Sequence, residues 1–335
     1  MAHYATKRFN YWGQLGILFA FLGAGVIIGF FASMIPLLSV IDLHSKDGLA
    51  KQIENILKPE NAAAIRWSQA IGTLFIFLVP TILYARVCHV KTALHLGFKN
   101  TINWKQVALA VIIMVACLPA VDALQDLTGM LPWSKATLLK FKEAEDEYSK
   151  QVAVIARMNN FTDYIISVVV IAFLPALVEE VLFRGGLQNL FTRWFKMPVL
   201  AIVITSIIFS AVHGSYLGFL SRFALGFVLG WMYYRTGNIW INIIAHFFNN
   251  AAAVTALYLS MKPGEKVDPS KMDENFPLWL GLVSIAAVAG LFIAFDKVGK
   301  KDIDRPGEEV LIPGYNYNNN PFDNDIASRY EGGQQ

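Results

Sequence analysis

Charged side chains are scarce in this sequence. Only 16% of the 335 residues are Asp, Glu, Lys or Arg, whereas 55% are hydrophobic, and the mean hydropathy is +0.46. No ordinary soluble domain of this length has such a composition, which excludes a soluble enzyme or a soluble binding domain. The composition instead predicts an all-α, polytopic membrane protein.

Cysteine is also rare, and the charges nearly balance. Cys88 and Cys117 lie in or beside apolar stretches, where small buried side chains are more common than a disulfide or a metal site. The net charge of +3 is too small to predict a nucleic-acid partner, and the lysines fit the flanks of membrane helices better. Because the first apolar run lacks a small-residue cleavage site, we expect a retained helix and not a removable signal peptide.

Long apolar runs dominate the rest of the chain. A helix needs about 20 apolar residues to cross a bilayer. Eight stretches approach this length, at residues 14–41, 67–88, 106–124, 163–183, 197–213, 216–234, 238–260 and 277–295. The fifth and sixth are the weakest, because the polar turn between them is very short, and one broken element is the alternative. We therefore expect about eight transmembrane helices.

The distribution of Lys and Arg indicates an orientation. If the amino terminus is cytoplasmic, the connections 86–105, 184–196 and 297–301 lie inside, and they contain cations with almost no acids. The opposing loops also contain lysines, but these alternate with acids. This pattern favours cytoplasmic termini in an integral multi-pass protein, in the plasma (inner) membrane if the protein is bacterial.

The chain divides into four parts. Residues 1–160 contain three predicted membrane helices and amphipathic surface helices, of which 134–158 is the clearest. That helix is interpreted as interfacial, with a lid over a site as the alternative. Residues 161–260 carry the polar intramembrane residues, and 261–299 contain the last membrane helix. The Asn-rich tail 300–335 lacks apolar periodicity, so we expect it to be disordered or to bind a partner.

Two adjacent glutamates, Glu179 and Glu180, close an apolar stretch that begins TDYIISVVVIAF. A charge near the middle of a bilayer costs at least about 2.5–3.5 kcal/mol, so such residues usually pair or line a polar cavity. Glu180 and Arg184 are four residues apart on one helix face and can pair there. Glu179 points about 100° away and is free to face a cavity, where it can act as a general base. We therefore predict an intramembrane polar cavity that contains a functional site.

Two further apolar helices carry residues that work with carboxylates in hydrolysis. Phe209 and His213 are four apart in FSAVH, and His246 and Asn250 are four apart in HFFNN. Each pair is a weak signal by itself, because a buried His or Asn often serves helix packing. Together, a carboxylate, two imidazoles and an amide on three apolar helices are difficult to explain by packing alone.

These residues also form three motifs: EEVLFR fits EExxxR, FSAVH fits FxxxH, and HFFNN fits HxxxN. In this order and at these separations, residues 160–260 resemble the CPBP family of intramembrane proteases. That family includes the CAAX prenyl endoproteases and bacterial relatives linked to bacteriocin processing and self-immunity. The resemblance implies cleavage of a membrane-associated protein or peptide inside a membrane cavity, with the lipid bilayer as the other partner.

The resemblance also implies roles for individual residues. Glu179 and His213 would activate a water molecule, and His246 with Asn250 would stabilise the oxyanion, without a cofactor. Glu180, Arg184 and Phe209 would support the site. A zinc ion held by Glu179, His213 and His246 is the metal-dependent alternative, although the sequence lacks HExxH spacing. A non-enzymatic immunity or scaffold protein, and a transporter with a proton relay, are the rival classes.

Helix arithmetic adds one expectation about the fourth membrane helix. If it ended at Arg184, Glu179 would lie only about 8 Å from the membrane edge, much shallower than His213. If it continues to Arg193, Glu179 lies about 21 Å from that edge and can approach His213. We therefore predict that Arg184 is inside the helix.

Overall fold

The computed structural model describes residues 9–41, 48–89, 91–260 and 276–299, and every regular element in them is a helix. Six helical runs are long and apolar enough to cross a membrane: Tyr11–Leu37 (α1), Ala62–Cys88 (α3 and α4), Trp104–Met130 (α6), Phe161–Phe195 (α8 to α10), Ile239–Ser260 (α13) and Leu278–Gly299 (α14). The prediction of an all-α, polytopic membrane protein is therefore confirmed, although the described residues contain six such runs and not the eight expected.

The fifth and sixth predicted spans form two separate helices, α11 (Pro198–Ala211) and α12 (Phe219–Thr236), and not one broken element. At 14 residues, α11 is about 21 Å long and too short to cross a hydrocarbon core of about 30 Å alone. The two helices pack against each other. The chain therefore reverses direction in the short connection between α11 and α12.

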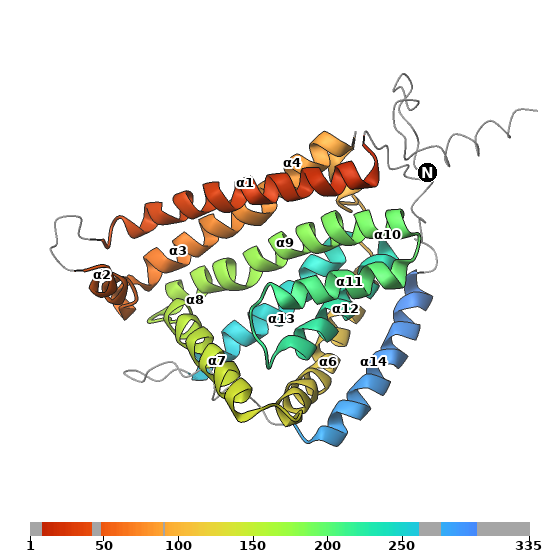
Figure 1. Cartoon of the computed structure of the whole chain (residues 1–335). Helices are drawn as coiled ribbons and strands as arrows, with labels where there is room; N and C mark the ends of the chain where they lie inside the picture. Colours follow the sequence, from red (N-terminus) through yellow and green to blue (C-terminus); the bar gives the residue numbers. More distant parts are fainter. Residues whose placement is uncertain (1–8, 42–47, 90, 261–275, 300–335) are drawn as a thin grey trace, which may run out of the picture.

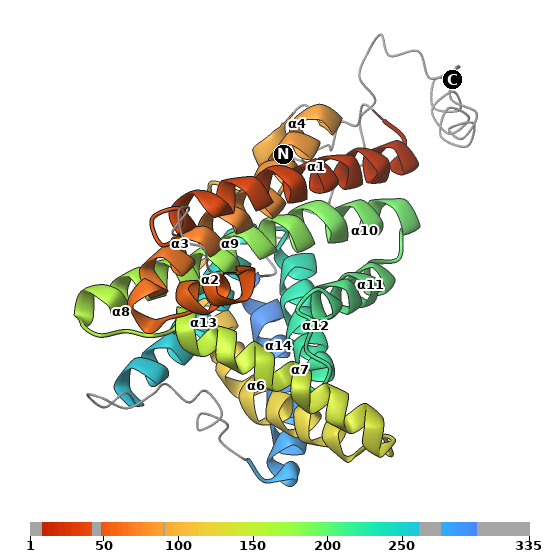
Figure 2. The same ribbon diagram turned by 60° about the vertical axis from the view of Figure 1, so that its left-hand side comes forward.

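The helices form layers, as Figures 1 and 2 show from two directions. On one side, α1 packs along α3 (Ala62–Thr73) and α4 (Val79–Cys88). On the other, α6 packs on α12, α13 and α14. The long helix α8 to α10 lies between these groups, with α11 and α13 beside it. This central position buries the helix that carries both glutamates.

The fourth span is one continuous helix of 35 residues, so the prediction that Arg184 lies inside it is confirmed. It comprises α8 (Phe161–Ser167), a π-helical segment Val168–Phe173, α9 (Leu174–Glu180), a second π-helical segment Val181–Gln188, and α10 (Asn189–Phe195). Pro175 follows the first π-helical segment, and Pro80 follows another, Leu74–Leu78, in the second span. Because proline lacks an N–H and crowds the preceding turn, the helix widens there without breaking.

Shorter helices lie outside the spans: α2 (Leu49–Ile56), α5 (Thr92–His95) and α7 (Lys135–Ile155). The expected amphipathic helix at 134–158 is thus present as α7, which runs across the ends of the bundle toward α6 (Figures 1 and 2). The expectations for the tail 300–335 and for the loop 261–275 concern residues outside the described ranges.

A buried arginine ties the N-terminal helices to the rest of the bundle. Arg66 on α3 is only 2% exposed, and its guanidinium donates to the backbone carbonyl of Arg157 at 2.7 Å. It also forms an ion pair with Asp163 on α8 at 3.4 Å. One side chain therefore joins α3, the connection after α7, and the start of the fourth span.

Candidate active site

The two glutamates have different surroundings, as their 100° separation predicts. Glu180 is fully buried, whereas the Glu179 side chain is 20% exposed. The Oε1 atom of Glu180 lies 3.1 Å from Nη1 of Arg184 and accepts a hydrogen bond from Nδ1 of His246 at 2.9 Å. Its Oε2 atom accepts from the amide of Asn242 at 3.2 Å. The predicted Glu180–Arg184 pair is confirmed, and two further donors satisfy the same carboxylate.

Glu179 faces both predicted histidines. Its Oε2 atom lies 4.0 Å from Nε2 of His213 and 3.9 Å from Nε2 of His246. The three residues come from the fourth span, the loop after α11, and α13, so three segments far apart in the sequence converge here. Distances near 4 Å leave the three polar atoms without direct hydrogen bonds to one another. A water molecule between them would have partners on each side.

Hydrogen bonds orient both imidazole rings in the same way. Nδ1 of His213 lies 2.6 Å from the backbone carbonyl of Phe209, and Nδ1 of His246 lies 2.9 Å from the Glu180 carboxylate. Both partners are acceptors, which assigns the Nδ1 proton to each ring. In a neutral ring the lone pair is then on Nε2, the nitrogen that faces Glu179. The site thus presents three acceptor atoms to one small space.

Phe209 supports the site through its ring and its backbone. It is 4% exposed, and its ring centroid lies 4.7 Å from the ring of His213. The guanidinium carbon of Arg184 lies 5.0 Å from the same ring, within the range of a cation–π contact. These two ring contacts, together with the Phe209 carbonyl that accepts from His213, hold the His213 imidazole and the Arg184 guanidinium in place.

Sequence reasoning missed how α12 holds the fourth span. Nη2 of Arg184 donates to the carbonyl of Gly226 at 3.1 Å, and the amide of Gln188 donates to the carbonyl of Gly230 at 2.8 Å. A Cβ atom at Gly226 would lie 3.2 Å from Phe209, so a larger residue would crowd this approach. The signal was present as GFVLG, because small residues four apart mark close helix packing in membranes.

It also missed Asn242, which is fully buried and donates to Glu180 and to the carbonyl of Leu229 at 2.6 Å. Asn242 precedes His246 by four residues, just as Asn250 follows it by four. The spacing rule that selected Asn250 therefore selects Asn242 equally well. Asn250 is half-buried, and its side chain forms no hydrogen bond with any residue in the described ranges. Its expected role in binding the oxyanion stays a prediction.

The loop after His213 is covered by α7. The Ser215 hydroxyl donates to the Glu145 carboxylate of α7 at 2.5 Å and accepts from the backbone N–H of Gly218 at 3.0 Å. The rings of Phe141 and Tyr216 stack with their centroids 4.6 Å apart. Irregular backbone at membrane depth is tolerated only where protein buries it or water reaches it. By covering this loop, α7 allows the chain to turn back beside the site.

We expect the Ser215→Ala substitution to lower the thermal stability of the purified protein. It removes the hydrogen bond to Glu145 and leaves the N–H of Gly218 without its acceptor, a loss of about 1–3 kcal/mol. Thermal unfolding in detergent measures the effect. Ser39→Ala is the matched control, because Ser39 is exposed and bonds only to a carbonyl of its own turn. Equal melting temperatures for both variants would contradict a structural role for this contact.

The side chains around Glu179 are spaced more widely than the ligands of a tetrahedral zinc ion. Within the described ranges, no group of three or more His, Cys, Asp or Glu side chains is arranged to hold a metal ion. Ligands of a tetrahedral zinc ion lie about 3.3 Å apart, given zinc–nitrogen bonds of about 2.05 Å. The separations of 3.9 and 4.0 Å around Glu179 are longer. However, a ring whose Nδ1 donates to a carboxylate or carbonyl is typical of metal-ligating histidines.

The fold and the site define a polytopic membrane protein with carboxylates and imidazoles facing one another inside a helix bundle. Residues 161–252 match the family described as Type II CAAX prenyl endopeptidase Rce1-like. The matched segment contains all three motifs, which confirms the resemblance to the CPBP family that these motifs predict. A match to this family indicates a protease.

One curated protein is similar to part of this chain. The chain is 33% identical over 112 residues to an uncharacterized protein, YpbD, of Bacillus subtilis (strain 168). The alignment covers 32% of this chain and 52% of YpbD, so it spans about half the length of that relative. No solved structure matches the chain significantly.

Proposed function

We propose that this protein is an intramembrane endopeptidase that hydrolyses a peptide bond in a membrane-associated protein or peptide. The observation that carries the proposal is the convergence of Glu179 Oε2 with Nε2 of both His213 and His246 at 3.9–4.0 Å. This space suits a water molecule held by a carboxylate and an imidazole. The termini lie in the cytoplasm in this proposal, with the protein in the plasma (inner) membrane if it is bacterial.

Glu179 is the general base. It accepts one proton of the water molecule, while His213 accepts a hydrogen bond from the other and thereby orients the oxygen. The water oxygen attacks the carbonyl carbon of the substrate, and the carbonyl π electrons move to its oxygen. When this tetrahedral intermediate collapses, the C–N bond breaks and Glu179 transfers its proton to the leaving nitrogen. The base is thus regenerated.

His246 stabilises the oxyanion. In this proposal His246 takes up a second proton from solvent, on Nε2, before the water molecule attacks. The buried Glu180, which accepts from the Nδ1–H of His246, balances the charge of the resulting imidazolium. Arg184 balances Glu180 in the absence of that proton, since it lies 3.1 Å from the carboxylate. Asn250, one turn along α13 from His246, is the second donor in this proposal. Phe209 holds His213 and Arg184 in place.

The zinc-dependent version of the same protease is the second candidate. The observation that favours it is the orientation of both rings, which direct Nε2 toward Glu179 while Nδ1 is held by an acceptor. Glu179, His213 and His246 would hold the ion, and it would supply a water molecule acidified by the metal. We favour the metal-free version because the three side chains are spaced for a bridging water molecule.

One assay separates these proposals from a non-enzymatic scaffold. The purified protein, reconstituted in lipid, is incubated with a lipidated peptide and with a transmembrane peptide, with and without a zinc chelator. We expect cleavage that persists in chelator and that falls roughly 10²-fold or more in His213→Ala and His246→Ala. Loss of cleavage in chelator, restored by zinc, would assign the metal-dependent version. Cleavage that survives in both variants would refute the site.

A further inference from the structure

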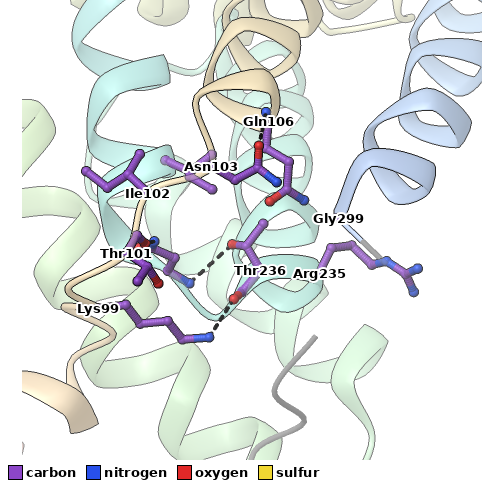
Figure 3. Close-up of a pocket in the computed structure, with 10 residues that line it drawn as sticks. Lys99, Thr101, Ile102, Asn103, Gln106, Arg235, Thr236 and Gly299 are labelled. Atoms are coloured by element: carbon purple, nitrogen blue, oxygen red, sulfur yellow. Dashed lines mark hydrogen bonds between the residues drawn. The ribbon is translucent and has the colours of Figure 1, made fainter. Parts of the chain in front are cut away.

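A polar cavity lies at one end of the bundle, apart from the candidate active site. Its volume is about 330 Å³, and it lies where α6 and α13 begin and where α12 and α14 end (Figure 3). None of the candidate catalytic residues lines it. Two of the residues that do, Lys99 and Arg235, are cationic. The cavity is therefore polar and cationic, and it is distinct from the candidate active site.

Both cations line the cavity, and each has a partner in the protein. Nζ of Lys99 lies 2.9 Å from the carbonyl of Thr236, near the end of α12, which fixes the ammonium at the cavity (Figure 3). Arg235 pairs with Asp296 through Nε at 2.7 Å. Its two terminal nitrogens have no partner among the residues that the structure describes. A planar guanidinium with free terminal N–H groups matches the geometry of a phosphate or carboxylate.

Gln106 provides an independent indication of a ligand. It is only 4% exposed and lines the cavity, but its side-chain amide bonds to no residue in the described part of the chain. Only its backbone N–H is bonded, to the Asn103 side chain (Figure 3). Buried amides are nearly always hydrogen-bonded. A buried amide without a partner in the described part of the protein therefore indicates a bound ligand. Gly299 leaves room for this amide, since a Cβ atom there would collide with it.

The position of the cavity identifies the source of the anion. Three predicted spans begin or end at its rim, which places it at the boundary of the hydrocarbon core. Trp104, the first residue of α6, is 68% exposed, as expected for an aromatic side chain at the level of lipid headgroups. Lys105 beside it is also exposed. Phosphate groups of lipids lie at this depth.

We propose that this cavity binds the phosphate group of an anionic phospholipid, held by Lys99, Arg235 and Gln106. The two cations attract the negative headgroup, and the Gln106 amide donates to a phosphate oxygen. The acyl chains then lie along the lipid-facing surface of α6. This binding site is independent of the proposed proteolysis, and its test uses no activity measurement.

The test is lipid retention by purified full-length protein, measured by native mass spectrometry after incubation with equal amounts of phosphatidylglycerol and phosphatidylcholine. We expect retained phosphatidylglycerol in the wild type and roughly ten-fold weaker binding in Gln106→Leu, which loses a hydrogen bond to a charged group without changing the net charge. Lys99→Gln is expected to weaken phosphatidylglycerol binding by a similar factor. Lys105→Ala is the matched control, because it removes a charge at the same surface but outside the cavity.

Several outcomes would overturn the proposal. If Gln106→Leu retains as much phosphatidylglycerol as the wild type, the Gln106 amide does not bind the lipid and the proposed site is wrong. An equal loss in Lys105→Ala and Lys99→Gln would indicate diffuse surface attraction. Protection from thermal unfolding by inorganic phosphate, with none by phosphatidylglycerol, would assign a soluble anion as the ligand. Melting temperatures in phosphatidylcholine identify any variant that fails to fold, and in that case Arg235→Gln replaces it under the same criteria.

Discussion

Replacement of Glu179 by Gln is expected to lower the rate of peptide cleavage roughly 10²- to 10⁴-fold, the usual contribution of a general base. The amide has almost the same shape as the carboxylate but cannot accept the proton of water. Glu179 is partly exposed and, among the residues that the structure describes, lies at ion-pairing distance only from the two histidines. The substitution should therefore leave the fold intact. Cleavage of a transmembrane peptide by reconstituted protein measures the effect.

Glu60→Gln is the matched control, since Glu60 is exposed and precedes the second span, far from the site in sequence. It should cleave at the wild-type rate. Comparable activity in Glu179→Gln and in the control would show that Glu179 is not the base. The inactive variant has a second use: a substrate that binds but is not cut can remain bound during purification, and its mass would identify it.

The second large effect concerns the buried charges. We expect Arg184→Met to destabilise the protein by about 3–5 kcal/mol, because it leaves the Glu180 carboxylate buried without its guanidinium partner. The remaining donors, the His246 imidazole and the Asn242 amide, lack the permanent charge of a guanidinium. Thermal unfolding in zwitterionic detergent measures the loss. The double variant Glu180→Gln, Arg184→Met removes both charges and should recover a substantial part of the stability.

The chain offers a matched control for this prediction. Arg235 and Asp296 also form an Arg–carboxylate pair, but their side chains are 29% and 28% exposed. Arg235→Met should cost about 0–1 kcal/mol, because solvent already screens the exposed pair and can hydrate the Asp296 carboxylate that remains in the variant. Equal losses in Arg184→Met and Arg235→Met, or a double variant no more stable than Arg184→Met, would contradict the view that burial makes the Glu180–Arg184 pair essential.

Local geometry allowed part of the site to be predicted from sequence. The relation between Glu180 and Arg184, and the separation of Glu179 from them, depend only on the turn of one helix. The polar residues on the two other segments, His213 and the pair His246 and Asn250, were identified because polar side chains are rare in apolar helices. The continuation of the fourth span past Arg184 followed from the need for Glu179 and His213 to lie at similar depths.

Other features of the site depend on how the helices pack, which the sequence alone does not show. Asn242 and Asn250 are equally spaced from His246, and only the packing of α13 against α9 and α12 selects Asn242 as the partner of Glu180. The contact between Ser215 and Glu145 joins residues 70 positions apart. The π-helical segments shift the helical register, which a fixed angle of 100° per residue does not include. Pro80 and Pro175, which follow two of these segments, are visible in the sequence, but a proline alone does not distinguish a widened turn from a broken helix.

The arginine that joins α3 to α8 ties the matched segment to the first half of the chain. The family match begins at residue 161, two positions before Asp163, yet Asp163 pairs with Arg66, nearly a hundred residues earlier. The matched segment therefore depends on a residue outside it for one of its ion pairs. A chimera with a relative should accordingly exchange both sides of this junction together.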